Sequence, residues 1–127
     1  MNILTVNLEP KLAEEIAIHA LPLGNSVYPG KDEDSLQGIL FTKLIHLIIA
    51  DDEQRYNIDS VDFLKWVRSV DERSEYKLII LTKNPTEDFI RTITALNPHG
   101  VISKKNSYTD IVKKVIQMID KINNEWN

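Results

Sequence analysis

Two short segments that are apolar almost from end to end constrain the fold of this chain most strongly. The segment 44–50 is LIHLIIA and continues directly into the acidic triplet Asp51-Asp52-Glu53, and the segment 77–82 is KLIILT. Strands of a parallel sheet carry apolar residues at successive positions because helices cover both faces of the sheet. Neither segment is long enough to span a bilayer. Both segments therefore predict central strands of a parallel sheet.

The rest of the chain alternates between strand-like and helix-like patterns. Leu12, Ile16 and Ala20, for example, recur at the spacing of one helical face, and Pro10 suits the first turn of that helix. Strand–helix order repeated along a chain is typical of an α/β protein with a doubly wound, five-stranded parallel sheet. The predicted strands are 3–6, 26–28, 44–50, 77–82 and 101–103, and the predicted helices are 10–21, 34–43, 60–70, a segment ending near 96, and 107–124.

Composition narrows the class of protein. The 127 residues fit one domain, 1–127, with 19 acidic side chains against 15 basic ones and a net charge of −4. This mild acidity argues against direct nucleic-acid binding. The absence of cysteine excludes a disulfide, a thiolate metal site and a cysteine nucleophile. Because residues 1–9 lack the basic region of a signal peptide, we expect a cytoplasmic protein without membrane contact.

Polar side chains stand where three of the predicted strands end. Asp51 follows the third strand, Thr82 ends the fourth, and Lys104 follows the fifth. Sites in doubly wound folds lie beyond the carboxyl ends of the strands, so these three side chains are expected to converge. A carboxylate can attack a phosphoryl group. A hydroxyl and an ammonium group can then bind the phosphoryl oxygens.

The chain resembles the receiver domain of bacterial response regulators over nearly its whole length. The segments that carry the resemblance are 46–51, 79–82 and 100–104. In the family, an aspartate ends the third strand, a threonine or serine ends the fourth, and a lysine ends the fifth. The resemblance implies the flavodoxin-like (βα)5 receiver fold and a role in two-component phosphorelay signal transduction.

The resemblance also implies roles and partners. Asp51 would be the phosphoacceptor, Thr82 the switch hydroxyl, and Lys104 the phosphate-binding lysine. The phosphoryl group would come from a sensor histidine kinase or a phosphotransfer protein. The face built from the fourth helix, the fifth strand and the fifth helix would contact an output protein or domain, or a second copy in a homodimer. Such a module is not an enzyme.

The sequence departs from the family at the metal site. Receivers hold Mg²⁺ with two acidic residues after the first strand, and those places fall here on Asn7 and Leu8. Mg²⁺ prefers carboxylate, carbonyl and water oxygens, and Leu8 offers none from its side chain. The ligands that remain are Asp51, the backbone carbonyl of Glu53 and, as a weak substitute, Glu9.

These departures leave an alternative function open. The chain can be a pseudo-receiver, a protein-interaction module that does not depend on phosphorylation. In that case Lys83 or Lys104 would form a permanent ion pair with Asp51 and fix one conformation without metal. A flavodoxin-like protein that binds a small molecule is a third alternative, but the residues after the first strand offer no phosphate-cradling loop.

Overall fold

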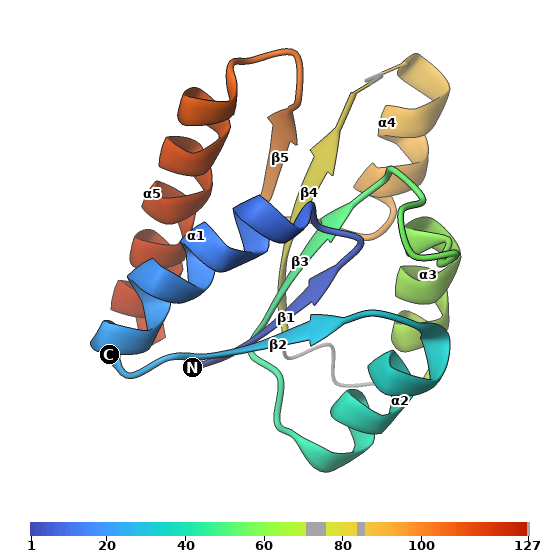
Figure 1. Ribbon diagram of the computed structural model, residues 1–127. Helices are drawn as coiled ribbons and strands as arrows, with labels where there is room; N and C mark the ends of the chain where they lie inside the picture. The colour runs from blue at the N-terminus through green and yellow to red at the C-terminus, as the bar shows by residue number, and fades with distance from the viewer. Residues whose placement is uncertain (71–75, 84–85, 127) are drawn as a thin grey trace.

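A computed structural model describes residues 1–70, 76–83 and 86–126, and its centre is one parallel sheet of five strands (Figure 1). The strand order is β2-β1-β3-β4-β5, so β3 lies in the middle, between β1 and β4. This confirms the predicted doubly wound α/β fold. The strands are β1 (Asn2–Val6), β2 (Ser26–Gly30), β3 (Leu47–Asp51), β4 (Lys77–Thr82) and β5 (Gly100–Ser103).

Helices cover both faces of the sheet. In Figure 1, α1 and α5 lie on one face, and α2, α3 and α4 lie on the other. Each face has its own apolar cluster: one contains Ile16 and Val115 from the first helix pair, and the other contains Leu36, Leu64 and Ile93 from the remaining helices. The helices are α1 (Pro10–Ala20), α2 (Glu33–Thr42), α3 (Ser60–Val70), α4 (Glu87–Thr94) and α5 (Tyr108–Trp126).

The central strand shows why its sequence is continuously apolar. All five residues of β3 are buried, because the strand has neighbours on both edges and helices on both faces. No helix in the described ranges of the chain is long and apolar enough to cross a membrane.

The predicted start of the third strand at Leu44 is wrong. The strand begins at Leu47, and Leu44 is 68% exposed. Residues 44–46 form the connection that returns the chain from the end of α2 to the sheet, where the Leu44 carbonyl accepts a hydrogen bond from the side chain of Asn2. Apolar content alone did not separate this connection from the strand, because Ile45 within it is buried beside α2 and α3.

The first helix also ends slightly earlier than predicted. Its α-helical part ends at Ala20, and Leu21–Leu23 form a 3₁₀ turn. Gly24 follows with φ of 84°, a left-handed conformation that glycine adopts without a steric penalty. The chain then reverses into β2.

Candidate functional site

The site lies at the carboxyl edge of the sheet, where parallel strands bring their ends together. Asp51 is the last residue of β3, Thr82 is the last of β4, and Lys104 directly follows β5. The backbone N–H of Lys104 donates to the Thr82 carbonyl at 2.8 Å, which continues the pairing of β4 and β5 by one residue. The carboxyl edge of the sheet therefore fixes the backbone positions of Asp51, Thr82 and Lys104.

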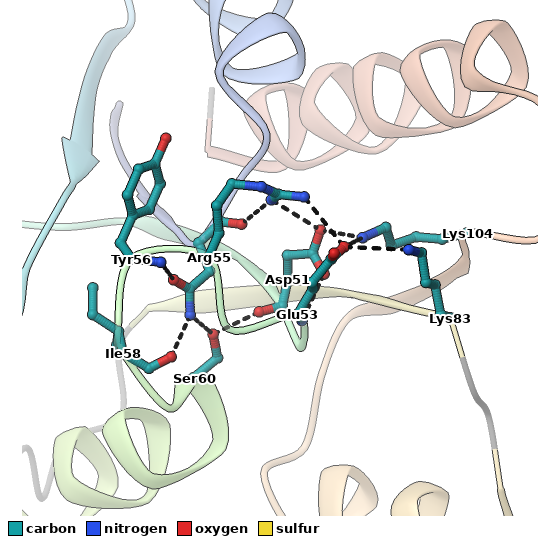
Figure 2. A network of polar contacts seen from close by, with 9 residues as sticks. Asp51, Glu53, Arg55, Tyr56, Ile58, Ser60, Lys83 and Lys104 are labelled. Atoms are coloured by element: carbon teal, nitrogen blue, oxygen red, sulfur yellow. Dashed lines mark hydrogen bonds and ion pairs between the residues drawn. The ribbon is translucent and has the colours of Figure 1, made fainter.

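Asp51 and Lys104 form a direct ion pair (Figure 2). The Nζ atom of Lys104 lies 2.7 Å from Oδ2 of Asp51 and 2.8 Å from Oε2 of Glu53. The other oxygen of Asp51, Oδ1, accepts a hydrogen bond from the backbone N–H of Glu53 at 2.9 Å. The Asp51 side chain is only 1% exposed, so this carboxylate has little contact with solvent and both of its oxygens have partners.

A second cation lies beside the same carboxylate. The Arg55 guanidinium places Nη1 3.8 Å from Oδ2 of Asp51, and Nη2 donates to Oε2 of Glu53 at 3.2 Å (Figure 2). Nη1 also donates to the backbone carbonyl of Asn7 at 2.6 Å. Asp51 thus lies between Lys104 and Arg55.

Of the two lysines predicted as partners of Asp51, only Lys104 contacts it. Lys83 turns to Glu53, with Nζ 3.6 Å from Oε2, and its side chain is 60% exposed. Exposed pairs of this kind contribute little to stability, whereas the Lys104 side chain is 12% exposed and its pair is screened much less.

Burial and pairing shift the pKa values of these groups in different directions. Burial raises the pKa of the Asp51 carboxyl, although hydrogen bonds from Lys104 and from the Glu53 backbone oppose the rise. The Lys104 hydrogen bond lowers the pKa of Glu53. Burial alone would lower the pKa of Lys104, but the hydrogen bonds to Asp51 and Glu53 outweigh it and raise that pKa. The ammonium form of Lys104 is therefore favoured in the folded protein.

Thr82 lies at the predicted edge but contacts a different carboxylate. Its hydroxyl donates to Oδ2 of Asp52 at 2.7 Å, and the residue is fully buried. The backbone N–H of Asp52 donates to the Leu81 carbonyl, which extends the β3–β4 pairing and turns the Asp52 side chain toward β4. Of the three side chains predicted to converge, Asp51 and Lys104 are therefore in contact, whereas the Thr82 hydroxyl binds the carboxylate of Asp52.

The side chain of Asn7, just after β1, is used to hold the loop between β3 and α3. Its Nδ2 donates to the Ile58 carbonyl at 2.7 Å and to Oγ of Ser60 at 2.8 Å. Its Oδ1 accepts from the backbone N–H of Tyr56 at 3.1 Å. Asn7 is fully buried and has φ of 58°, a left-handed conformation that asparagine tolerates better than most residues.

The residues at the predicted metal site do not fit a divalent cation. Leu8 is buried in the apolar cluster beneath α1, and the Asn7 amide is bound into the loop. Glu9 is exposed and precedes the first turn of α1. The Arg55 guanidinium lies 3.8 Å from Oδ2 of Asp51, an oxygen that a metal ion would need, and it also binds the side chain of Glu53. Among the described residues, no cluster of three or more His, Cys, Asp or Glu side chains is arranged to hold a metal.

Sequence reasoning missed the roles of Arg55, Asp52 and Ser60. Oγ of Ser60 donates to the Asp51 carbonyl at 2.6 Å and thereby joins the start of α3 to the end of β3. An arginine four residues after Asp51, in a chain with Asn7 and Leu8 at the places of the two acids, was the signal available for Arg55. Its contact with Asn7 lies 48 residues away along the chain, so local pattern does not reveal it.

Solved receiver domains share this fold. A response regulator from Thermotoga maritima aligns with a TM-score of 0.72 and 16% identity over 95% of both chains. The Francisella response regulator 1452 receiver domain aligns with a TM-score of 0.74 and 16% identity over 99% of this chain and 98% of that chain. The Mn²⁺-bound form of response regulator Rcp1 aligns with a TM-score of 0.73 and 16% identity, covering 94% and 91%.

These similarities confirm the resemblance to response regulator receiver domains at the level of the fold. No protein-family model and no curated protein matches the sequence.

Proposed function

We propose that this chain is a receiver-like signalling module of the two-component type that acts through protein contacts, with Asp51 held permanently in ion pairs. The observation that carries the proposal is the state of the Asp51 carboxylate. It is 1% exposed, Oδ1 accepts from the Glu53 backbone, and the Arg55 guanidinium lies 3.8 Å from Oδ2. A nucleophilic carboxylate needs an oxygen that a donor molecule can approach. Here both oxygens already have partners inside the protein.

The proposed contact surface is the α4–β5–α5 face. Ile90 on α4 is 42% exposed and Val101 on β5 is 43% exposed. Side chains alternate along a strand, and Ile102 packs into the cluster under α5, so Val101 points to the face of the sheet that α4 covers. Exposed apolar side chains on a face of this kind suit a protein partner in the cytoplasm: a histidine kinase, an output protein or a second copy of the chain.

Phosphoryl acceptance on Asp51 is the second candidate, and the 2.7 Å contact from Lys104 favours it. In this reaction a carboxylate oxygen attacks the phosphorus of a phosphohistidine, the N–P bond breaks, and the imidazole nitrogen leaves with the bonding pair. The product is an acyl phosphate on Asp51. Lys104, already beside Oδ2, would neutralise charge on the transferred group.

One experiment separates the two candidates. The protein is incubated with acetyl phosphate, with and without Mg²⁺, and its intact mass is followed beside that of Asp51→Asn. The first proposal expects no phosphoryl adduct in either protein. An adduct on the wild type that is lost in Asp51→Asn would overturn that proposal and support phosphoryl acceptance. An ordinary receiver treated in parallel shows that the donor is active.

A further inference from the structure

We infer that the guanidinium of Arg55 is the resident cation of this site and makes its order and charge balance independent of a divalent metal. Three oxygen atoms converge on this group. They are the backbone carbonyl of Asn7 at 2.6 Å, Oε2 of Glu53 at 3.2 Å and Oδ2 of Asp51 at 3.8 Å. One carbonyl and two carboxylates are a donor set that a hard divalent cation would use, and Arg55 already contacts all three.

The positions of these oxygens explain why an arginine side chain can contact all three of them. They come from the end of β1, the end of β3 and the loop that follows β3. A planar guanidinium carries donors on two terminal nitrogens in a fixed geometry, so it can reach two elements at once. Nη1 contacts Asn7 and Asp51, and Nη2 contacts Glu53. The two terminal nitrogens of one guanidinium thus contact all three residues.

The carboxylates of the site already have cationic partners. Asp51 and Glu53 supply two negative charges, and Lys104, Arg55 and the more exposed Lys83 supply three positive charges within ion-pair distance of them. A divalent cation added here would meet these positive side chains in a site whose carboxylates are already neutralised. Coulomb repulsion at such distances is strong wherever solvent screening is reduced, and the Arg55 side chain is only 23% exposed.

The backbone around Arg55 is also fixed. Tyr56, the next residue, donates its N–H to Oδ1 of Asn7, so the same asparagine holds the guanidinium through its carbonyl and the following residue through its side chain. Moving the Arg55 guanidinium away to admit a metal ion would break its contact with the Asn7 carbonyl, while the Tyr56 contact holds the backbone in place. The inference deepens the proposed function at the same site, but it concerns cation binding and not phosphoryl transfer.

The test measures cation binding directly. Wild type, Arg55→Met, Arg55→Lys and the control Arg91→Met are compared by NMR during titration with Mn²⁺, following line broadening of the amides of residues 51–56. Arg91 is a suitable control because it is 72% exposed and its ion-pair partners among the described residues, Glu87 and Asp88, belong to its own helix. Thermal unfolding of the same four proteins is measured with MgCl₂ and with NaCl at equal ionic strength.

We expect wild type and Arg91→Met to show no site-specific broadening and the same Tm in both salts. Arg55→Met should bind Mn²⁺ at residues 51–56 at least about tenfold more tightly than wild type, because one repelling charge is removed. Its Tm should be lower than that of wild type and should rise with Mg²⁺. Arg55→Lys keeps the charge and should remain insensitive to the metal.

Saturable broadening of residues 51–56 in the wild type would overturn the inference, and so would an Arg55→Met protein that folds and binds Mn²⁺ no better than wild type. If Arg55→Met does not fold, the inference is still tested by the Mn²⁺ titrations of the wild type and of Arg55→Lys, since site-specific binding to either protein would contradict it. No phosphodonor is present, so the inference and the proposed function can fail separately: an acyl phosphate formed without metal would overturn only the latter.

Discussion

The side-chain amide of Asn7 donates to Oγ of Ser60 at 2.8 Å, and that hydroxyl donates to the backbone carbonyl of Asp51 at 2.6 Å. Through these two bonds the end of β1 and the start of α3 are joined to the last residue of β3. The loop that carries Glu53 and Arg55 is closed at both ends by this connection. Asn7 therefore acts as a structural clamp at the place where receivers have an acid.

Replacing Asn7 tests the clamp. Asn7→Ala should lower the free energy of unfolding by about 2–4 kcal/mol, because it removes three hydrogen bonds from a fully buried position and leaves their partners unpaired. Urea unfolding followed by circular dichroism measures the change. Asn7→Gly is the control for backbone strain, since glycine accepts the φ of 58°. A glycine variant as stable as wild type would show that the hydrogen bonds contribute nothing.

The partner of Thr82 can be identified with a double-mutant cycle. Thr82→Val removes the hydroxyl that lies 2.7 Å from Asp52 and keeps the shape of the side chain. We expect it to cost about 1–2 kcal/mol, and to couple with Asp52→Ala by about 1 kcal/mol. The same cycle with Asp51→Asn should give a smaller coupling energy. A larger coupling with Asp51 would contradict the contact found here.

Alkaline pH should selectively weaken the contribution of Lys104. Its folded-state pKa is raised above the ordinary 10.5, so the folded protein holds this proton more tightly than the unfolded chain does. The stabilisation is complete below pH 10.5 and is lost as the pH rises through the folded-state pKa. The difference in unfolding free energy between wild type and Lys104→Met should therefore narrow above pH 10.5. Chemical denaturation at a series of pH values measures it, and a constant difference would refute the prediction.

Two glycines should respond to alanine with opposite signs. At Gly30 an added Cβ would lie 2.0 Å from Cδ2 of Leu36, which is fully buried, so Gly30→Ala should destabilise the protein by about 1–3 kcal/mol. At Gly38, inside α2, an added Cβ would meet open space beyond the adjacent helix backbone, as far as the described residues extend. Gly38→Ala should stabilise by about 0.5–1 kcal/mol through helix propensity. Thermal unfolding of both variants measures the two changes in stability. If both variants were destabilised, or both stabilised, the prediction would be contradicted.

Sequence periodicity was sufficient to predict the helices and strands that form the layers of this fold, but it was insufficient to predict the connections between them. Leu12, Ile16 and Ala20 on α1 are buried as their spacing predicts, because burial of one helical face follows directly from that spacing. The start of β3 was misplaced because an apolar residue under a helix and one in a strand look alike in sequence.

The same limit applies to the site. Asp51 and Lys104 could be placed at one edge from the sequence because parallel strands bring their carboxyl ends together there, whereas the choice between Lys83 and Lys104 as the partner of Asp51 stayed open until the structure showed the Lys104 contact. The contact of Arg55 with the Asn7 carbonyl and the bond from Thr82 to Asp52 depend on loop conformation and side-chain direction. Loop conformation and side-chain direction cannot be inferred from residue spacing, so these two contacts were found only in the structure.

The balance of charges at this edge has a consequence for molecules that approach it. The acids Asp51, Asp52 and Glu53 stand beside the bases Arg55, Lys83 and Lys104, so the formal charges of these six side chains sum to zero. They therefore add little to electrostatic steering, which gathers charged molecules from a distance and depends on ionic strength. A molecule that binds here is selected by shape and direct contact after it arrives.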